Sequence, residues 1–163
     1  MKDANACDRM DQIMAPLAQT PLFDSSRQRP PKAPALIAEL PPTLAWSLIR
    51  LGRLVLLDVR TIEERRYVGH VPGSLHIAWA TGTALQRNPR FVGEVEAKLA
   101  KATPLALLCR SGKRAAEAAE ALTDAGFQEV YSVQAGFEGN LNANQRRGTK
   151  DGWRFHGLPW LQD

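Results

Sequence analysis

Residues 105–119 read LALLCRSGKRAAEAA and predict a buried strand, a short loop and the start of a helix. Residues 105–108 are apolar without alternation, which is typical of a strand buried on both faces of a parallel sheet. Cys109 follows directly after this strand. Because ligands of parallel α/β sheets bind beyond the carboxyl ends of the strands, Cys109 is expected at a binding site.

The loop after Cys109 carries cations and small residues, and the predicted helix begins immediately behind it. Backbone N–H groups in such a loop can converge on an anion, and the helix start adds positive potential. These surroundings favour the thiolate form of a cysteine. A buried structural cysteine is the alternative, since free cysteine packs as a small hydrophobe. The expected anion-binding residues are Arg110, Ser111, Gly112, Lys113 and Arg114.

Strand and helix patterns alternate on both sides of this stretch. Two further apolar runs, at 54–57 and 130–133, predict buried strands. Helical periodicity covers residues 44–51, 89–101 and 113–125. This alternation indicates an α/β fold with a parallel sheet and helices on both faces.

The composition is that of a soluble globular protein. The chain has 163 residues, 44% of them hydrophobic and 23% charged, and a net charge of +4. The cations are dispersed, which argues against nucleic-acid binding. No apolar run has transmembrane length and no signal peptide is evident, so we expect no membrane association and a cytoplasmic location. Residues 1–34, rich in proline, are predicted to form a flexible N-terminal extension, and residues 35–163 the folded domain.

The two cysteines, Cys7 and Cys109, match neither a disulfide framework nor a metal site. His76 and His156 also lack the spacing of metal ligands. We therefore expect no metal, no cofactor and a reducing compartment. The role of Cys7 is left open, because a cysteine in a flexible extension can in principle form a disulfide with Cys109.

Cysteine phosphatases also hold a thiolate in a loop of backbone amides at a helix start. Their signature needs an arginine at the position that is Ala115 here, whereas Arg114 comes one residue too early. The shorter loop makes a tighter anion site, which suits sulfur better than a tetrahedral phosphate. Phosphatase or arsenate chemistry is therefore the minor alternative at this loop.

Four landmarks in the chain occur in a recognisable order. They are LDVR at 57–60, GHVPGS at 69–74, the loop at 109–114, and AGF at 125–127 followed by VY at 130–131 and GF at 136–137. In this order and spacing they resemble the rhodanese family, in particular its bacterial single-domain, thiosulfate sulfurtransferase-like members. The resemblance covers residues 35–163 and includes the C-terminal segment 152–160.

The resemblance implies a five-stranded parallel sheet flanked by helices and an enzyme that transfers sulfur. Cys109 falls on the catalytic nucleophile, which takes sulfur as a persulfide from a small anionic donor such as thiosulfate. It then passes this sulfur to a thiophilic acceptor such as cyanide or a thiol. Arg110 to Arg114 fall on the substrate-binding loop, whose length is that of sulfurtransferase members. The alternative is a non-enzymatic persulfide carrier or interaction module that delivers sulfur to an accepting protein.

The segment between Arg60 and Gly69 departs from the common single-domain pattern by one additional residue and by its basic residues. It resembles two-domain thiosulfate sulfurtransferases, in which an arginine here helps to bind substrate. Arg66 is therefore predicted to contact the substrate anion, with a solvated arginine on a helix face as the alternative. Asp58 is expected to cap a turn or pair with an arginine, and His70 to orient the following turn by hydrogen bonding.

Overall fold

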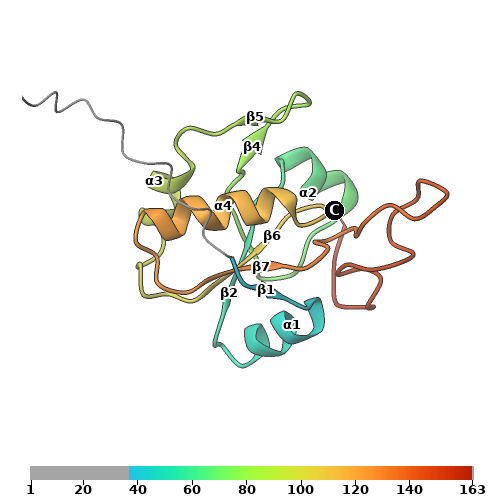
Figure 1. Cartoon of the computed structure of the whole chain (residues 1–163), viewed down its shortest axis with the longest axis horizontal. Coiled ribbons are helices and arrows are strands. Elements are labelled where there is room, and N and C mark those ends of the chain that lie inside the picture. The colour runs from blue at the N-terminus through green and yellow to red at the C-terminus, as the bar shows by residue number, and fades with distance from the viewer. Residues whose placement is uncertain (1–36, 163) are drawn as a thin grey trace, which may run out of the picture. The chain divides into compact units, whose positions relative to one another are not determined.

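A computed structural model describes residues 37–162 of the chain (Figure 1). The predictions for residues 1–34, including the one for Cys7, lie outside this range. No helix in the described part is long and apolar enough to cross a membrane.

A five-stranded parallel sheet forms the centre of the fold, as predicted. Its strands are β1 (Glu39–Leu40), β2 (Val55–Asp58), β3 (Leu75–His76), β6 (Leu105–Leu108) and β7 (Val130–Val133). They are arranged in the order β1-β7-β6-β2-β3, and all pairings within this sheet are parallel. All four residues of β6 are buried, because this middle strand is covered on both faces. The continuous apolar run that predicted β6 is therefore explained by its central position.

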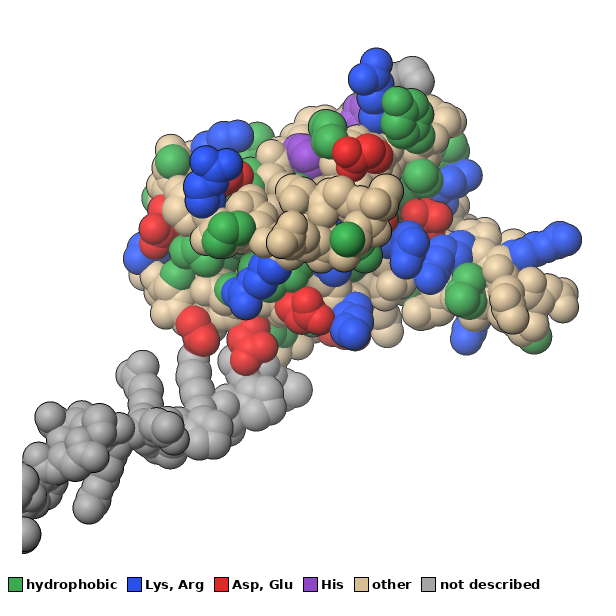
Figure 2. Space-filling view, turned by 90° about the horizontal axis from the view of Figure 1, so that it is seen from above, with side chains coloured by type: hydrophobic (Ala, Val, Ile, Leu, Met, Phe, Trp, Pro, Cys, Tyr) green, Lys and Arg blue, Asp and Glu red, His purple; other side chains and the backbone are tan. Residues whose placement is uncertain are grey.

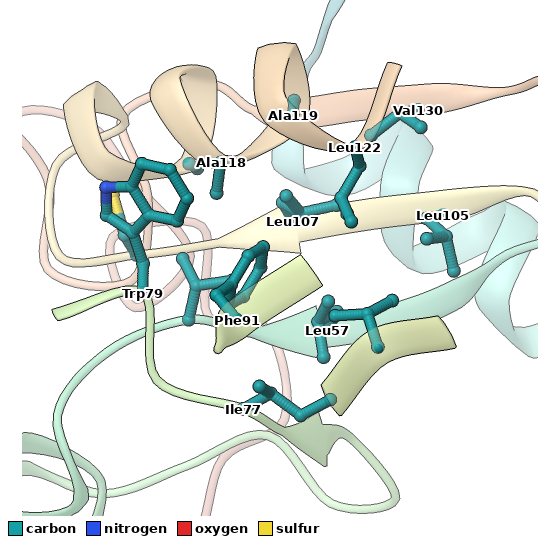
Figure 3. Packing of buried hydrophobic residues seen from close by; sticks show 14 of the residues in the cluster. Leu57, Ile77, Trp79, Phe91, Leu105, Leu107, Ala118, Ala119, Leu122 and Val130 are labelled. Atoms are coloured by element: carbon teal, nitrogen blue, oxygen red, sulfur yellow. The ribbon is translucent and has the colours of Figure 1, made fainter. Parts of the chain in front are cut away.

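Four helices accompany the sheet: α1 (Pro42–Arg50), α2 (Ile62–Val68), α3 (Phe91–Glu96) and α4 (Lys113–Asp124). Figure 1 shows α4 on one side of the strands and α1 on the other. The alternation of side chains along β6 matches this arrangement. Leu105 and Leu107 pack with residues of α3 and α4, whereas Ala106 and Leu108 pack with residues of α1. Figure 3 shows the first of these two clusters, with Leu107 below α4.

Helix α3 is shorter than the segment 89–101 predicted from periodicity. After Glu96 the chain continues in turns, and the Lys98 N–H donates to the Val95 carbonyl at 3.0 Å. The Leu99 N–H donates to the same carbonyl at 2.9 Å, so the chain leaves the helix through a turn that mixes contacts three and four residues apart. Only Phe91 and Val95 of α3 are buried, so a short helix suffices to cover this part of the sheet.

A two-stranded antiparallel hairpin follows β3 and was not predicted. It consists of β4 (Ala80–Thr81) and β5 (Gln86–Arg87), with Ala80 opposite Arg87. The Asn88 N–H donates to the Trp79 carbonyl at 2.9 Å and closes the base of the hairpin. This hairpin contributes one wall of the site described below.

The irregular C-terminal segment completes the second core cluster (Figure 1, orange to red). Trp153 is fully buried, and its Nε1 donates to the Pro159 carbonyl at 2.9 Å. Its ring also meets Trp46 of α1 edge to face, with 5.8 Å between the centroids. The segment is therefore an integral part of the described domain.

Candidate active site

Cys109 lies at the carboxyl end of β6, where the sequence placed it. Its side chain is 1% exposed, and its Sγ accepts a hydrogen bond from the Gly112 N–H at 3.1 Å. A hydrogen bond donated to sulfur stabilises the thiolate relative to the thiol. The same donor stabilises any other negatively charged sulfur species held at this position.

The loop is held from behind by the turn that follows β7. The carbonyl oxygen of Cys109 accepts from the Phe137 N–H at 2.7 Å, and that of Arg110 accepts from the Glu138 N–H at 3.0 Å. Gly136 allows this close approach, because a Cβ there would overlap the Cys109 carbonyl oxygen. Its φ of +62° is also a conformation that favours glycine. These two carbonyl oxygens are bound on the outer side of the loop. The Gly112 N–H is therefore free to donate its hydrogen bond to the Cys109 Sγ on the inner side.

Helix α4 begins directly at the loop. Gly112 is its N-terminal cap, with a φ of +102°, and its carbonyl accepts the Ala116 N–H at 3.0 Å. A side chain at this φ would be strained, so glycine is needed for the chain to turn from the strand into the helix. The N-terminal end of the twelve-residue α4 therefore adds a partial positive charge next to Cys109.

Arg114 is held by Glu64 from α2. The two side chains form a bidentate pair, with both N–O distances at 2.7 Å, and both are largely buried. Glu64 also closes a capping box with Thr61 at the start of α2. The pair fixes the position of the Arg114 guanidinium. Because its N–H groups already donate to Glu64, Arg114 is less able to bind a second anion.

The pair sets the ionisation of both partners. Burial would raise the pKa of Glu64, but hydrogen bonds from Arg114 and the Thr61 backbone hold it below its ordinary value. Burial would likewise lower the pKa of Arg114, but its hydrogen bonds to Glu64 and the charges of Glu64 and nearby groups raise it. The loop therefore carries a permanent positive charge at Arg114.

Asp58 has the structural role that the sequence predicted. Its buried carboxylate pairs with Arg60 at 2.7 Å and with Arg65 at 3.2 Å. His70 hydrogen-bonds through its backbone to Leu161 at 2.7 and 2.8 Å, whereas its side-chain Nδ1 is buried without a hydrogen-bond partner. The Ser74 hydroxyl, which donates to the Val71 carbonyl at 2.7 Å, fixes that turn instead.

A cavity of about 310 Å³ adjoins the loop. Residues from the loop and α4 form one side, and residues near the hairpin form the other. Its lining comprises Arg110, Ser111, Lys113, Arg114, Glu117, Trp79, Ala80, Leu85 and Arg87. Four of the predicted substrate-binding residues thus meet at one cavity, while Gly112 is buried beside the sulfur. The opening gives a small anion a place to approach the loop.

Arg66 does not line this cavity. It is exposed on α2, and its guanidinium lies 5.9 Å from the centre of the Tyr67 ring. Its neighbour Arg65 is the arginine directed toward Asp58. The role of Arg66 in substrate binding therefore stays a prediction to which the structure adds no contact.

Sequence reasoning missed the residues that the hairpin region contributes. The Trp79 Nε1 donates to a Glu117 carboxylate oxygen at 3.2 Å, and Figure 3 shows the indole next to α4. The sequence could have indicated Glu117, because it follows Lys113 by one helical turn and therefore lies on the same face of the helix. Arg87 and Leu85 had none, because no local pattern brings the hairpin to the loop.

Charges on the molecular surface are mixed. Figure 2 shows cationic side chains spread over one face with acidic side chains between them. The positive groups at the cavity are thus a local feature of the loop, α4 and the hairpin.

Comparisons with known proteins agree with the landmarks in the sequence. The Rickettsia prowazekii protein RP600, named as uncharacterized, is 32% identical over 130 residues, covering 77% of this chain and 98% of that protein. The thiosulfate sulfurtransferase GlpE of Actinobacillus pleuropneumoniae serotype 5b is 30% identical over 122 residues, covering 74% and 90%. The crystal structure of Rv0390 from M. tuberculosis matches with a TM-score of 0.70 at 38% identity, covering 77% and 98%. The rhodanese-like domain family matches residues 41–143, and the chain belongs to that family.

Proposed function

We propose that this protein is a sulfurtransferase that carries sulfur as a persulfide on Cys109. The observation that supports this most directly is the Gly112 N–H donated to the Cys109 Sγ at 3.1 Å. It lies at the start of α4, next to a cavity with several cationic lining residues. This setting suits a sulfur that acts as a nucleophile and carries negative charge during the reaction.

In the first half-reaction the Cys109 thiolate attacks the outer sulfur of thiosulfate. A bond forms between the two sulfur atoms as the S–S bond of thiosulfate breaks, and its electron pair leaves with sulfite. The products are a persulfide anion on Cys109 and sulfite, so charge is conserved and no proton moves. The Gly112 N–H and the α4 start stabilise the negative charge before and after the step.

In the second half-reaction an acceptor removes the outer sulfur. The lone pair of cyanide attacks it, the S–S bond breaks, and its electron pair restores the Cys109 thiolate as thiocyanate leaves. A thiolate acceptor reacts in the same way and leaves as a persulfide. The chemistry takes place at sulfur alone and needs no general acid, general base or cofactor.

The cavity residues have different parts in binding the donor. Arg110 and Lys113 are exposed, so they attract the anionic donor and can rotate to meet it. Ser111 offers a hydroxyl and a backbone N–H. Arg114 is committed to Glu64, so it contributes a fixed positive charge. Arg110, Ser111, Gly112, Lys113 and Arg114 together form the proposed substrate-binding loop.

Burial of the sulfur favours small donors and acceptors. With Cys109 only 1% exposed, a reaction partner must pass between the loop residues to reach the sulfur. A small ion or a thin thiol meets this requirement better than a folded protein surface. We place the reaction in a reducing cytoplasm, within a domain of residues 35–163 and with residues 1–34 as an extension.

Steady-state formation of thiocyanate from thiosulfate and cyanide tests this proposal. The wild-type protein should turn over repeatedly, and Cys109→Ser should lose turnover by at least about a thousandfold. Circular dichroism of Cys109→Ser provides the control for folding. If the wild-type protein accepts sulfur once but passes it only to a protein thiol, it is a carrier and the enzymatic proposal is wrong.

A further inference from the structure

The cavity beside the loop reaches beyond the loop itself. Its volume is about 310 Å³, and Arg110, Ser111, Lys113 and Arg114 form only part of its lining. The rest of the space extends toward the hairpin, where Leu85 and Arg87 form the wall.

Arg87 is held in place at this wall. Its guanidinium lies 4.4 Å from the centre of the Trp79 ring. Trp79 is itself fixed, since Phe91 packs edge to face against it at 5.0 Å and its Nε1 donates to Glu117. A guanidinium stacked on a ring on one side still offers its N–H edge to an anion. The stacking on Trp79 restricts the exposed Arg87 guanidinium, which lines the cavity outside the loop.

Leu85 stands beside Arg87 in an unfavourable conformation. Its φ is +51°, which glycine adopts readily and leucine rarely does. Its side chain is 44% exposed and lines the cavity. An exposed leucine in a strained turn adds little to the stability of the fold. It does offer an apolar surface against which the carbon body of a ligand can pack. This second observation points to the same part of the cavity.

From these features we infer that Arg87 and Leu85 are specificity-determining residues for organic thiosulfonates that carry a second acidic group. The inference rests on the proposed sulfurtransferase function and names its preferred donor class. The thiosulfonate end lies at the loop with Arg110 and Lys113, the carbon body lies along Leu85, and the second acidic group meets Arg87. Glu117 is the carboxylate in the lining, and its bond to Trp79 draws it toward the indole.

The transfer step from such a donor balances as it does for thiosulfate. The Cys109 thiolate attacks the terminal sulfur of the thiosulfonate anion and forms the new S–S bond. The bond between that sulfur and the sulfonyl sulfur breaks, and its electron pair leaves with the organic sulfinate. One persulfide anion and one sulfinate anion result from two anions, so no oxidant, reductant or proton is needed.

The kinetic test compares 4-carboxybenzenethiosulfonate with benzenethiosulfonate, which lacks the second acidic group. The ratio of their kcat/KM values should fall about tenfold in Arg87→Ala, which corresponds to about 1.4 kcal/mol. In Leu85→Gly, kcat/KM for both aromatic donors should fall relative to methanethiosulfonate, while thermal stability stays the same or rises. Arg90→Ala is the matched control, because Arg90 is 85% exposed and lies outside this cavity lining. An unchanged ratio in Arg87→Ala would overturn the inference.

A binding measurement separates this inference from the proposed function. The non-reacting probe is 4-sulfobenzoate, titrated into the wild-type protein and the two arginine variants by calorimetry. Binding that weakens about tenfold in Arg87→Ala and not in Arg90→Ala would support the assignment even if no sulfur were transferred. Equal binding by all three proteins would overturn it, even if thiosulfate proved to be a good donor.

Discussion

Glu64→Gln removes the charge from the Glu64–Arg114 pair while keeping a side chain that can close the capping box of α2. The two side chains are 18% and 13% exposed, so the pair lies between the surface and the fully buried case. Surface pairs contribute about 0–1 kcal/mol, and breaking buried pairs costs about 3–5 kcal/mol. We therefore expect the free energy of unfolding at pH 7 to fall by about 2 kcal/mol.

Urea denaturation followed by circular dichroism measures this change, and an unchanged m value keeps the comparison valid. Arg114→Gln and the double variant complete a thermodynamic cycle, in which the coupling energy should exceed about 1 kcal/mol. If the coupling is near zero, Glu64 does not hold Arg114 and the account of the loop charge is wrong. Lys98→Gln, on the exposed surface, controls for the loss of a charge.

The same pair predicts a pH dependence. The pKa of Glu64 is lowered in the folded protein. Its contribution to the free energy of unfolding is therefore fully present above the ordinary pKa of a glutamate. This contribution is lost as the pH falls through the lowered pKa. The difference in free energy of unfolding between the wild type and Glu64→Gln should therefore shrink below about pH 4.3. A difference that stays constant down to pH 3 would contradict the shifted pKa.

Three further predictions concern the loop, the helix α2 and the N-terminal residues. Gly136→Ala should lower the free energy of unfolding by more than about 2 kcal/mol and slow thiocyanate formation, because the new Cβ would displace the Cys109 carbonyl. Gly148→Ala, which has a similar φ of +74° but open space, should cost only about 1 kcal/mol in the same urea titration. Arg66→Ala should leave the KM for thiosulfate within about twofold, since Arg66 is outside the cavity, and a tenfold rise would restore its predicted role. Removal of residues 1–34 should leave the melting temperature and thiocyanate formation nearly unchanged, and loss of either would refute their assignment as an extension.

The parts of the fold that local sequence determines were predicted well. Residues 105–108 and 130–133 form strands within the predicted bounds, because a short apolar run between turn residues has few other stable states. Strands β1 and β3, of two residues each, were not predicted. Their extended state depends on pairing with β7 and β2, and nothing within two residues encodes it.

The candidate site divides in the same way. Cys109 and its loop are contiguous, so their chemistry could be predicted from one stretch of sequence. The partner of Arg114 could not, because Glu64 precedes it by fifty residues and meets it only when α2 and α4 pack. The exposed position of Arg66 could not be predicted either, because the packing of α2 determines which of its residues faces Asp58, and that residue is Arg65. The hairpin wall with Arg87 also depends on tertiary packing alone.

The intact mass of the purified protein tests the central claim most directly. The mass is recorded after thiosulfate and again after cyanide, for the wild type and for Cys109→Ala. The account predicts that the wild type gains one sulfur atom, that cyanide removes it, and that the variant gains none. If the wild type gains no sulfur, or if Cys109→Ala gains as much, Cys109 does not carry a persulfide and the proposed mechanism is wrong.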